Sequence, residues 1–232
     1  MKTIKKQVIV ISLGGSLIVP EQVDYKFLEK FKKTIHSLYK KYKFIIITGG
    51  GSIARKYIQA LKTEGKSKFA LSQAGIRATR MNALFLMQFF GKEANSNLPR
   101  NMGEVNNNIH KNSVVICGAL RYSNNSTSDT TAAKLAHFLK TIFINITNVK
   151  GLYTDNPKTN PKAKLIKNIS WKEFEKMALK TKYQPGQHFV LDQQAAVLIK
   201  KYKIPTYIIG KNLSNLKKLL NNNPFEGTQI KE

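Results

Sequence analysis

The chain has 232 residues, enough for one domain with a substantial core or for two closely packed lobes. Its 39 lysines and arginines far exceed its 13 acidic residues, so a net charge of +26 favours anionic ligands, from nucleotides to nucleic acid, over basic ones. No apolar run reaches the ~20 residues of a membrane span, and the single cysteine, Cys117, excludes an internal disulfide and favours the reducing cytoplasm.

Two apolar, strand-like runs in the N-terminal part each lead into glycines. Residues 7–13 (QVIVISL) are followed by Gly14 and Gly15, and residues 44–48 (FIIIT) are followed by three glycines at 49–51 and a basic helical pattern. Glycines let main-chain N–H groups approach an anion, and the N-terminus of the following helix adds partial positive charge. We therefore expect a phosphate site there. A tight turn without a ligand is the alternative.

Strand and helix patterns alternate through the next part of the chain. Residues 20–42 have apolar side chains at helical spacing, and a strongly apolar helix is expected from Gly75 to Gly91. Two arginines near its start, Arg77 and Arg80, are candidates for reaching an anion, although solvated arginines are the simpler interpretation. Residues 92–112 are rich in asparagine and predict no element.

The C-terminal half continues the alternation. After a strand at 114–117, Asp129 is expected to cap the N-terminus of a helix over 130–140, and a strand follows at 142–146. A surface loop is expected at 155–168. The remaining predicted elements are helices at 170–180, 190–202 and 213–221 and strands at 206–209 and 227–230. The alternation predicts an α/β fold with a mainly parallel sheet.

Three other site motifs fit poorly. Residues 49–54 match the dinucleotide fingerprint, but residues 69–73, where its acidic residue would be sought, contain no acid. Residues 60–67 (ALKTEGKS) come close to a Walker loop, yet they follow a helix, whereas that loop requires a preceding strand. The four histidines lack the spacing of a metal site.

Six motifs in register resemble the amino-acid kinase family, specifically its archaeal uridylate (UMP) kinases. They are 14–16 (GGS), 49–57 (GGGSIARKY), 75–83 (GIRATRMNA), 127–129 (TSD), 147–153 (TNVKGLY) and 191–196 (LDQQAA). The resemblance implies a three-layer α/β/α sandwich with a mainly parallel sheet. It also implies a single domain over 1–232, with an acceptor-binding lobe at about 1–125 and an ATP-binding lobe at about 126–232.

The resemblance further implies transfer of the γ-phosphate of ATP to UMP, with Mg²⁺ accompanying ATP. Arg55 is the expected catalytic residue, because a guanidinium can pair two phosphate oxygens and neutralise transition-state charge. The implied ATP-binding residues are Ser12, Leu13, Gly14, Gly15, Ser16, Gly51, Arg55, Thr147, Asn148 and Tyr153, and the implied UMP-binding residues are Gly50, Thr127 and Ser128. A homo-oligomer, specifically a hexamer, is implied as well, and the apolar helix at 76–90 is compatible with an interface.

Several positions depart from the family pattern. Ser72 stands where the subfamily usually has an acceptor-binding aspartate, Lys150 and Asn156 replace aspartates, and the loop at 120–126 is poorly matched. These departures leave two alternatives open. One is a kinase for another small phosphomonoester such as isopentenyl phosphate. The other is a non-catalytic nucleotide- or nucleic-acid-binding protein on the same fold.

Overall fold

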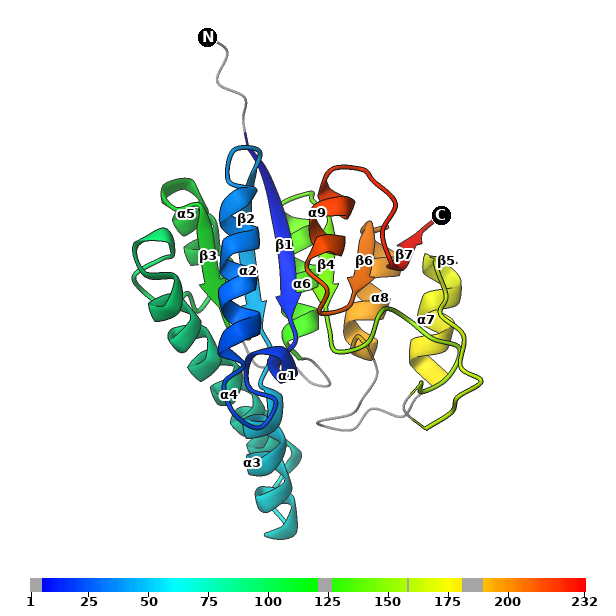
Figure 1. Cartoon of the computed structure of the whole chain (residues 1–232). Helices are drawn as coiled ribbons and strands as arrows, with labels where there is room; N and C mark the ends of the chain where they lie inside the picture. The colour runs from blue at the N-terminus through cyan, green and yellow to red at the C-terminus, as the bar shows by residue number, and fades with distance from the viewer. Residues whose placement is uncertain (1–5, 121–126, 158, 181–189) are drawn as a thin grey trace.

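A single seven-stranded sheet forms the centre of the molecule, with the strand order β3-β2-β1-β4-β6-β7-β5 (Figure 1). The structure is a computed structural model that describes residues 6–120, 127–157, 159–180 and 190–232. All neighbouring strands are parallel except β6 and β7. The strands are β1 (Gln7–Leu13), β2 (Tyr42–Thr48), β3 (Val114–Cys117), β4 (Phe143–Ile146), β5 (Asn168–Ser170), β6 (Thr206–Ile209) and β7 (Gly227–Lys231).

Helices cover both faces of this sheet, which confirms the predicted three-layer α/β/α architecture. One layer contains α1 (Gly15–Ile18), α2 (Tyr25–Ser37), α4 (Lys68–Phe90) and α9 (Ser214–Leu220). The other contains α5 (Met102–Lys111), α6 (Ser128–Phe138), α7 (Trp171–Lys180) and α8 (Gln193–Lys201). A hairpin of α3 (Gly51–Thr63) and the start of α4 projects from the body at the end where β1 and β2 finish (Figure 1).

The central strands are apolar on both faces because each face packs on a helix layer. In β1, Ile9 and Ile11 contact the layer of α2 and α4, whereas Val10 between them contacts the layer of α6 and α8. All three side chains are fully buried. Burial of one such side chain contributes about 1.5–3 kcal/mol. Within the described ranges, no helix is long and apolar enough to cross a membrane.

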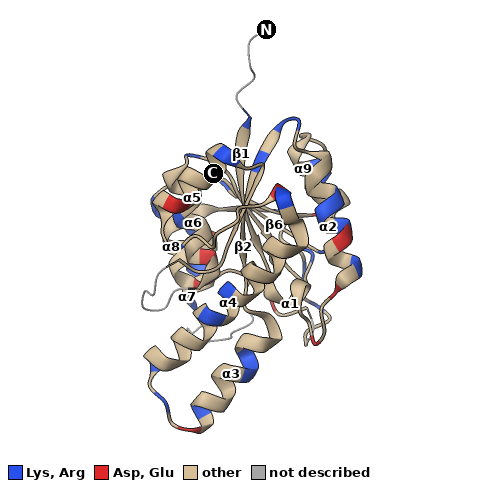
Figure 2. Ribbon diagram, turned by 90° about the vertical axis from the view of Figure 1, so that its left-hand side faces the viewer, with Lys and Arg blue, Asp and Glu red and all other residues tan. Residues whose placement is uncertain are grey.

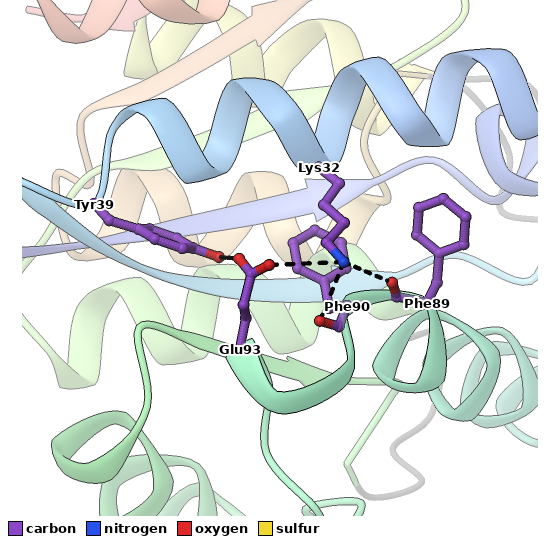
Figure 3. A network of polar contacts seen from close by, with 5 residues as sticks. All are labelled: Lys32, Tyr39, Phe89, Phe90 and Glu93. Carbon is purple, nitrogen blue, oxygen red and sulfur yellow. Dashed lines mark hydrogen bonds and ion pairs between the residues drawn. The ribbon is translucent and has the colours of Figure 1, made fainter.

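Lys32 of α2 binds the C-terminal end of α4 (Figure 3). Its Nζ donates to the carbonyl oxygens of Phe89 at 3.0 Å and Phe90 at 3.3 Å, and lies 3.6 Å from a carboxylate oxygen of Glu93. Tyr39 donates to the same carboxylate at 2.8 Å, and burial together with this bond raises the pKa of Tyr39. The terminal carbonyls of α4 thus gain a cationic partner that also fits the helix dipole.

The Asn95 side chain binds backbone groups on the outer side of β3, which is an outermost strand of the sheet. Its side chain is 3% exposed, accepts from the amide of Ile116 at 2.6 Å and donates to the Ile116 carbonyl at 3.1 Å. We expect Asn95→Ala to lower the free energy of unfolding by about 2–4 kcal/mol, because both groups of Ile116 lose their partner in the interior. Urea denaturation measures the change. The exposed Asn97→Ala is the control, and equal stability of the two variants would contradict the prediction.

Two helices begin at other residues than the periodicity predicts. α2 begins at Tyr25 rather than near residue 20, because the Asp24 side chain caps it by accepting from the amide of Phe27 at 3.0 Å. α4 begins at Lys68 rather than at Gly75, with Ser67 as its N-cap. The additional turns of α4 pack against α3 in the projecting hairpin.

Candidate functional site

The loops that follow β1 and β2 lie in direct backbone contact. The two strands are paired up to Leu13 and Thr48, so both loops start at the same edge of the sheet. A Cβ atom added to Gly15 would lie 2.1 Å from the amide nitrogen of Gly51 and 2.6 Å from the carbonyl carbon of Gly49. The two glycine-rich segments therefore form one continuous backbone surface, at the edge where open α/β sheets bind ligands.

The first turn of α3 adds N–H groups and Arg55 to this surface. α3 begins at Gly51, whose φ of +64° is in the left-handed region that favours glycine. Ser52 donates to the carbonyl oxygen of Val19 at 3.0 Å and ties the helix start to the loop after α1. Arg55 lies one turn into α3 and is half-buried. Positive partial charge, N–H groups and a guanidinium at one helix terminus can stabilise a phosphate.

Polar residues of α4 hold the neighbouring loops in place. The Asn82 amide donates to the carbonyl oxygen of Gly49 at 2.8 Å, and this side chain is 3% exposed. The Thr79 hydroxyl accepts from the amide of Ala119, just after β3, at 3.0 Å. The polar positions of the 75–83 motif therefore support the loops around the site.

Arg80 of α4 also supports a loop at the site, the one that follows β3. Its Nε donates to the carbonyl oxygen of Ala119 at 3.0 Å, and its guanidinium also donates to that of Leu120. The Arg80 guanidinium thus holds the start of the loop after β3, whereas Arg77 is exposed. Residues 121–126, which make up most of the loop that departs from the family pattern, lie outside the described residues.

The start of α6 faces the end of β1. Thr127 is the N-cap and the helix begins at Ser128, so the prediction that Asp129 caps this helix is wrong. The Thr127 hydroxyl accepts from the amide of Asp129 and takes the capping position, while the Asp129 carboxylate accepts from the Ser12 hydroxyl at 2.6 Å. Ser12 is 1% exposed. This bond places the start of α6 beside the loop after β1.

A second carboxylate, that of Asp192, joins α6 to α8. It is 4% exposed, caps α8 by accepting from the amide of Ala195 at 2.7 Å, and accepts from the hydroxyls of Thr127 at 2.6 Å and Thr130 at 2.7 Å. Two residues predicted to bind nucleotide, Ser12 and Thr127, thus donate hydrogen bonds from their hydroxyl groups to aspartates. Both aspartates lie within the sequence motifs 127–129 and 191–196, but the motifs do not predict these hydrogen bonds.

Burial raises the pKa of Asp129 to about 7, the charge of Asp192 acts in the same direction, and the hydrogen bond from Ser12 opposes both. Part of the residue reaches the surface, but its carboxyl group is enclosed by protein. In the unfolded chain an aspartate titrates near 3.9. Between these values the folded state binds more protons than the unfolded state, so stability falls as the pH rises toward 7.

Asp129→Asn is expected to remove this pH dependence. Relative to the variant, the wild-type protein should lose roughly 1–3 kcal/mol of unfolding free energy between about pH 4 and pH 8. Urea denaturation of both proteins across that range tests this. A stability difference that stays constant with pH would show that Asp129 is ionised throughout.

The loop after β4 lies at the same end of the sheet as the loop after β1. The amide of Gly14 donates to the carbonyl oxygen of Ile146 at 2.9 Å, which sets residues 147–153 beside the loop after β1. On its far side this loop is fixed to β7, because the amide of Leu152 donates to the hydroxyl of Thr228 at 2.8 Å. Lys150 pairs with Glu226 at 2.7 Å.

The predicted site residues therefore fall in three neighbouring places. The first is the contact between the loops after β1 and β2, the second is the start of α6, and the third is the loop after β4. In that order they hold Leu13, Gly14, Gly15, Ser16, Gly50, Gly51 and Arg55, then Ser12 with Thr127 and Ser128, then Thr147, Asn148 and Tyr153. Asn148 is exposed and Tyr153 is half-buried.

Comparison with known families agrees with this arrangement. The sequence profile described as "Amino acid kinase family" matches residues 7–210. The chain belongs to the amino acid kinase family. The match begins at the first residue of β1 and ends directly after β6, so it includes every loop of the site described above.

Individual relatives in the amino acid kinase family are similar over nearly the whole chain. Uridylate kinase of Thermoplasma volcanium is 34% identical over 226 residues, 97% of each chain. Uridylate kinase of Thermococcus kodakarensis is 32% identical over 204 residues, 88% of this chain and 90% of the relative. The crystal structure of uridylate kinase from Archaeoglobus fulgidus superposes with a TM-score of 0.82 at 32% identity, covering 96% of this chain and 99% of that one.

Proposed function

We propose that this protein transfers the γ-phosphoryl group of ATP to UMP and releases ADP and UDP. The observation that carries the proposal is the backbone contact between the loops after β1 and β2, with Arg55 at the start of the adjoining helix. Related proteins aligned over nearly the full length are named uridylate kinases, which supports UMP as the acceptor.

In this proposal a phosphate oxygen of UMP attacks the γ-phosphorus, and the bond from that phosphorus to the bridging oxygen of ADP breaks. Gly51 and the loop after β1 hold the donor phosphates, Gly50 and the start of α6 face the acceptor, and residues 147–153 hold adenosine. The acceptor lobe would comprise about 1–125 and the ATP lobe about 126–232. Such a reaction depends mainly on positioning and on neutralising charge, which glycine loops and a guanidinium supply.

Magnesium would enter this site with ATP. Within the described residues, no group of three histidine, cysteine, aspartate or glutamate side chains could hold a metal ion. Mg²⁺ is commonly bound through substrate phosphates rather than by a protein cage, so these residues are compatible with a metal held mainly by ATP. When bound, the ion would neutralise charge on the phosphates.

The acceptor is tested by a coupled assay of ADP release with Mg²⁺ and ATP. UMP, CMP, dUMP and isopentenyl phosphate are compared as acceptors at equal concentration. We expect UMP to give the largest kcat/KM. Turnover of isopentenyl phosphate alone, or turnover of no monophosphate at all, would overturn the proposal.

We also propose that the protein is a homo-oligomer that associates through α4, in a hexamer as the family resemblance implies. Large apolar side chains of α4 lie at the surface: Met81 is 47% exposed, Leu84 49% and Phe85 36%. Burial against a second copy would remove this apolar area from water. Light scattering should give a mass above that of one chain, and Leu84→Glu should lower it. A monomer at working concentration would contradict this.

A further inference from the structure

The edge of the sheet formed by the amino-terminal ends of the parallel strands, opposite the glycine loops, carries a row of lysines. Lys41 precedes β2 and Lys6 precedes β1, and the amide of Gln7 bonds to the Lys41 carbonyl. Lys140 and Lys203 stand three residues before β4 and β6, which are neighbouring parallel strands. With strands spaced about 4.8 Å apart, the row from β2 to β6 extends roughly 15 Å. Figure 2 shows basic segments gathered around the end where β1 begins.

Two of these lysines occupy the same unusual backbone position. Lys140 and Lys203 have φ of 50° and 49°, and each follows the last turn of a helix, α6 or α8. Glycine or asparagine is the usual residue there, because other side chains are strained in this region. Two neighbouring helices thus end in the same turn with lysine at the left-handed position. Non-glycine residues in such conformations are a reason to look for a function.

An aromatic pair lies between these lysines. The rings of His137 and Tyr202 are stacked with centroids 3.6 Å apart, and Tyr202 is 39% exposed. Phe138, beside the pair in sequence, is 51% exposed. Two depressions of about 290 and 460 Å³ share His137, Lys140 and Tyr202 in their walls, and the smaller one also includes Lys203.

The charge at this place is positive. Of the described residues lining either depression, none is acidic, and Lys134 lines the larger one. The C-termini of α6 and α8 contribute about half a negative charge each, which offsets only one of the three lysines in the two walls. Acidic residues approach this edge at its β7 end, where Glu232 follows the last strand.

We propose that this edge binds a single-stranded nucleic acid. Its phosphates would contact the lysine row. Its bases would stack on the exposed ring of Phe138 and on Tyr202, where a base would take the place of the Lys201 ammonium that now lies 5.3 Å from the ring centroid. Cationic side chains that follow the backbone, together with aromatic rings that stack on bases, are the two elements of such recognition. The site is separate from the glycine loops and does not depend on the kinase reaction.

The test uses a fluorescein-labelled oligouridylate of about 15 nucleotides and fluorescence anisotropy with the full chain. For about four phosphate contacts, affinity should fall roughly 50-fold between about 50 and 200 mM salt. Saturating ATP and UMP should leave binding unchanged. Displacement of the oligonucleotide by these ligands, or binding without salt dependence, would overturn the proposal.

Variants locate the site. The double variant Lys140→Asn with Lys203→Asn removes two charges, while asparagine tolerates the left-handed backbone better than lysine. It should bind about tenfold more weakly and with a shallower salt dependence. Tyr202→Ala should bind at least about fivefold more weakly through lost stacking.

The matched control is Lys62→Asn with Lys66→Asn, which removes the same charge at the tip of the α3–α4 hairpin. It should bind as the wild type does, and all variants should keep kinase activity. Equal weakening by the control, or no effect of Tyr202→Ala, would assign the binding to net charge alone and refute the site.

Discussion

Replacement of Gly15 by alanine is expected to abolish most of the nucleotide phosphorylation and to destabilise the fold. The added Cβ would lie 2.1 Å from the amide nitrogen of Gly51 and 2.6 Å from both the carbonyl carbon and the oxygen of Gly49. All these neighbours are backbone atoms, so relief requires the two loops to separate. Misplacement of reacting groups by about 1 Å can cost 10²-fold, and we expect kcat/KM to fall at least about that much. Overpacking should cost roughly 1–3 kcal/mol of stability.

Gly14→Ala is the matched control for this experiment. Its Cβ would lie 3.1 Å from the carbonyl oxygen of Ile146 and 3.7 Å from the next atom, so a shift of a few tenths of an ångström suffices. We expect a loss of less than about tenfold in kcat/KM, in keeping with a displacement well below 1 Å. Steady-state assays and urea denaturation of both variants decide the matter. A Gly15→Ala enzyme as active as Gly14→Ala would show that contact between the loops is not required.

The parts of the fold that the sequence predicts are those in which one strong local pattern has a single interpretation. β1 runs over residues 7–13 as predicted, because an uninterrupted apolar run leads into glycines and both of its faces are buried. By contrast, the asparagine-rich stretch at 92–112 contains α5 over Met102–Lys111. The buried side chains of this helix are those of Val105 and Ile109. With the partly buried Met102, only three of its ten residues are apolar, and they stand among asparagines, so the period is too weak to predict a helix.

The sequence does not predict the first turns of α4, for a different reason. Its first two turns lie in the projecting hairpin, where Phe69 is 55% exposed, and they pack against α3 rather than on the sheet. No broad apolar stripe marks them, so the sequence predicts a helix only from Gly75, where the strongly apolar segment starts. Ser67 carried the signal that could have placed the boundary, since serine is a preferred N-cap residue.

In the candidate site, the sequence predicts which segments gather but not how their polar side chains pair. Thr127 and Asp129 are both good N-cap residues, and local sequence does not choose between them. The choice depends on Ser12, which is 117 residues away along the chain and bonds to Asp129. Likewise, Asn82 supports Gly49 across 33 residues. Such pairings exist only once the sheet has brought the strand ends together.

Arg55→Ala is expected to lower kcat by about 10²–10³, the range found when one group that stabilises transition-state charge is removed. Arg55 is half-buried on the first turns of α3 and supports no part of the core. The unfolding free energy should therefore change by less than about 0.5 kcal/mol. Arg55→Lys should recover only part of the rate, because an ammonium keeps the charge but cannot pair two phosphate oxygens in one plane.

The division between kcat and KM decides the role of Arg55. A guanidinium that acts mainly on the transition state lowers kcat and kcat/KM together when removed, whereas one that binds ATP equally in ground and transition states raises KM and leaves kcat unchanged. Lys62→Ala, which removes an exposed cation from the last turn of the same helix, controls for the lost charge and should alter neither constant. If Arg55→Ala raises only the KM for ATP, the charge that develops during transfer must be neutralised elsewhere, and Arg55 would be a binding residue.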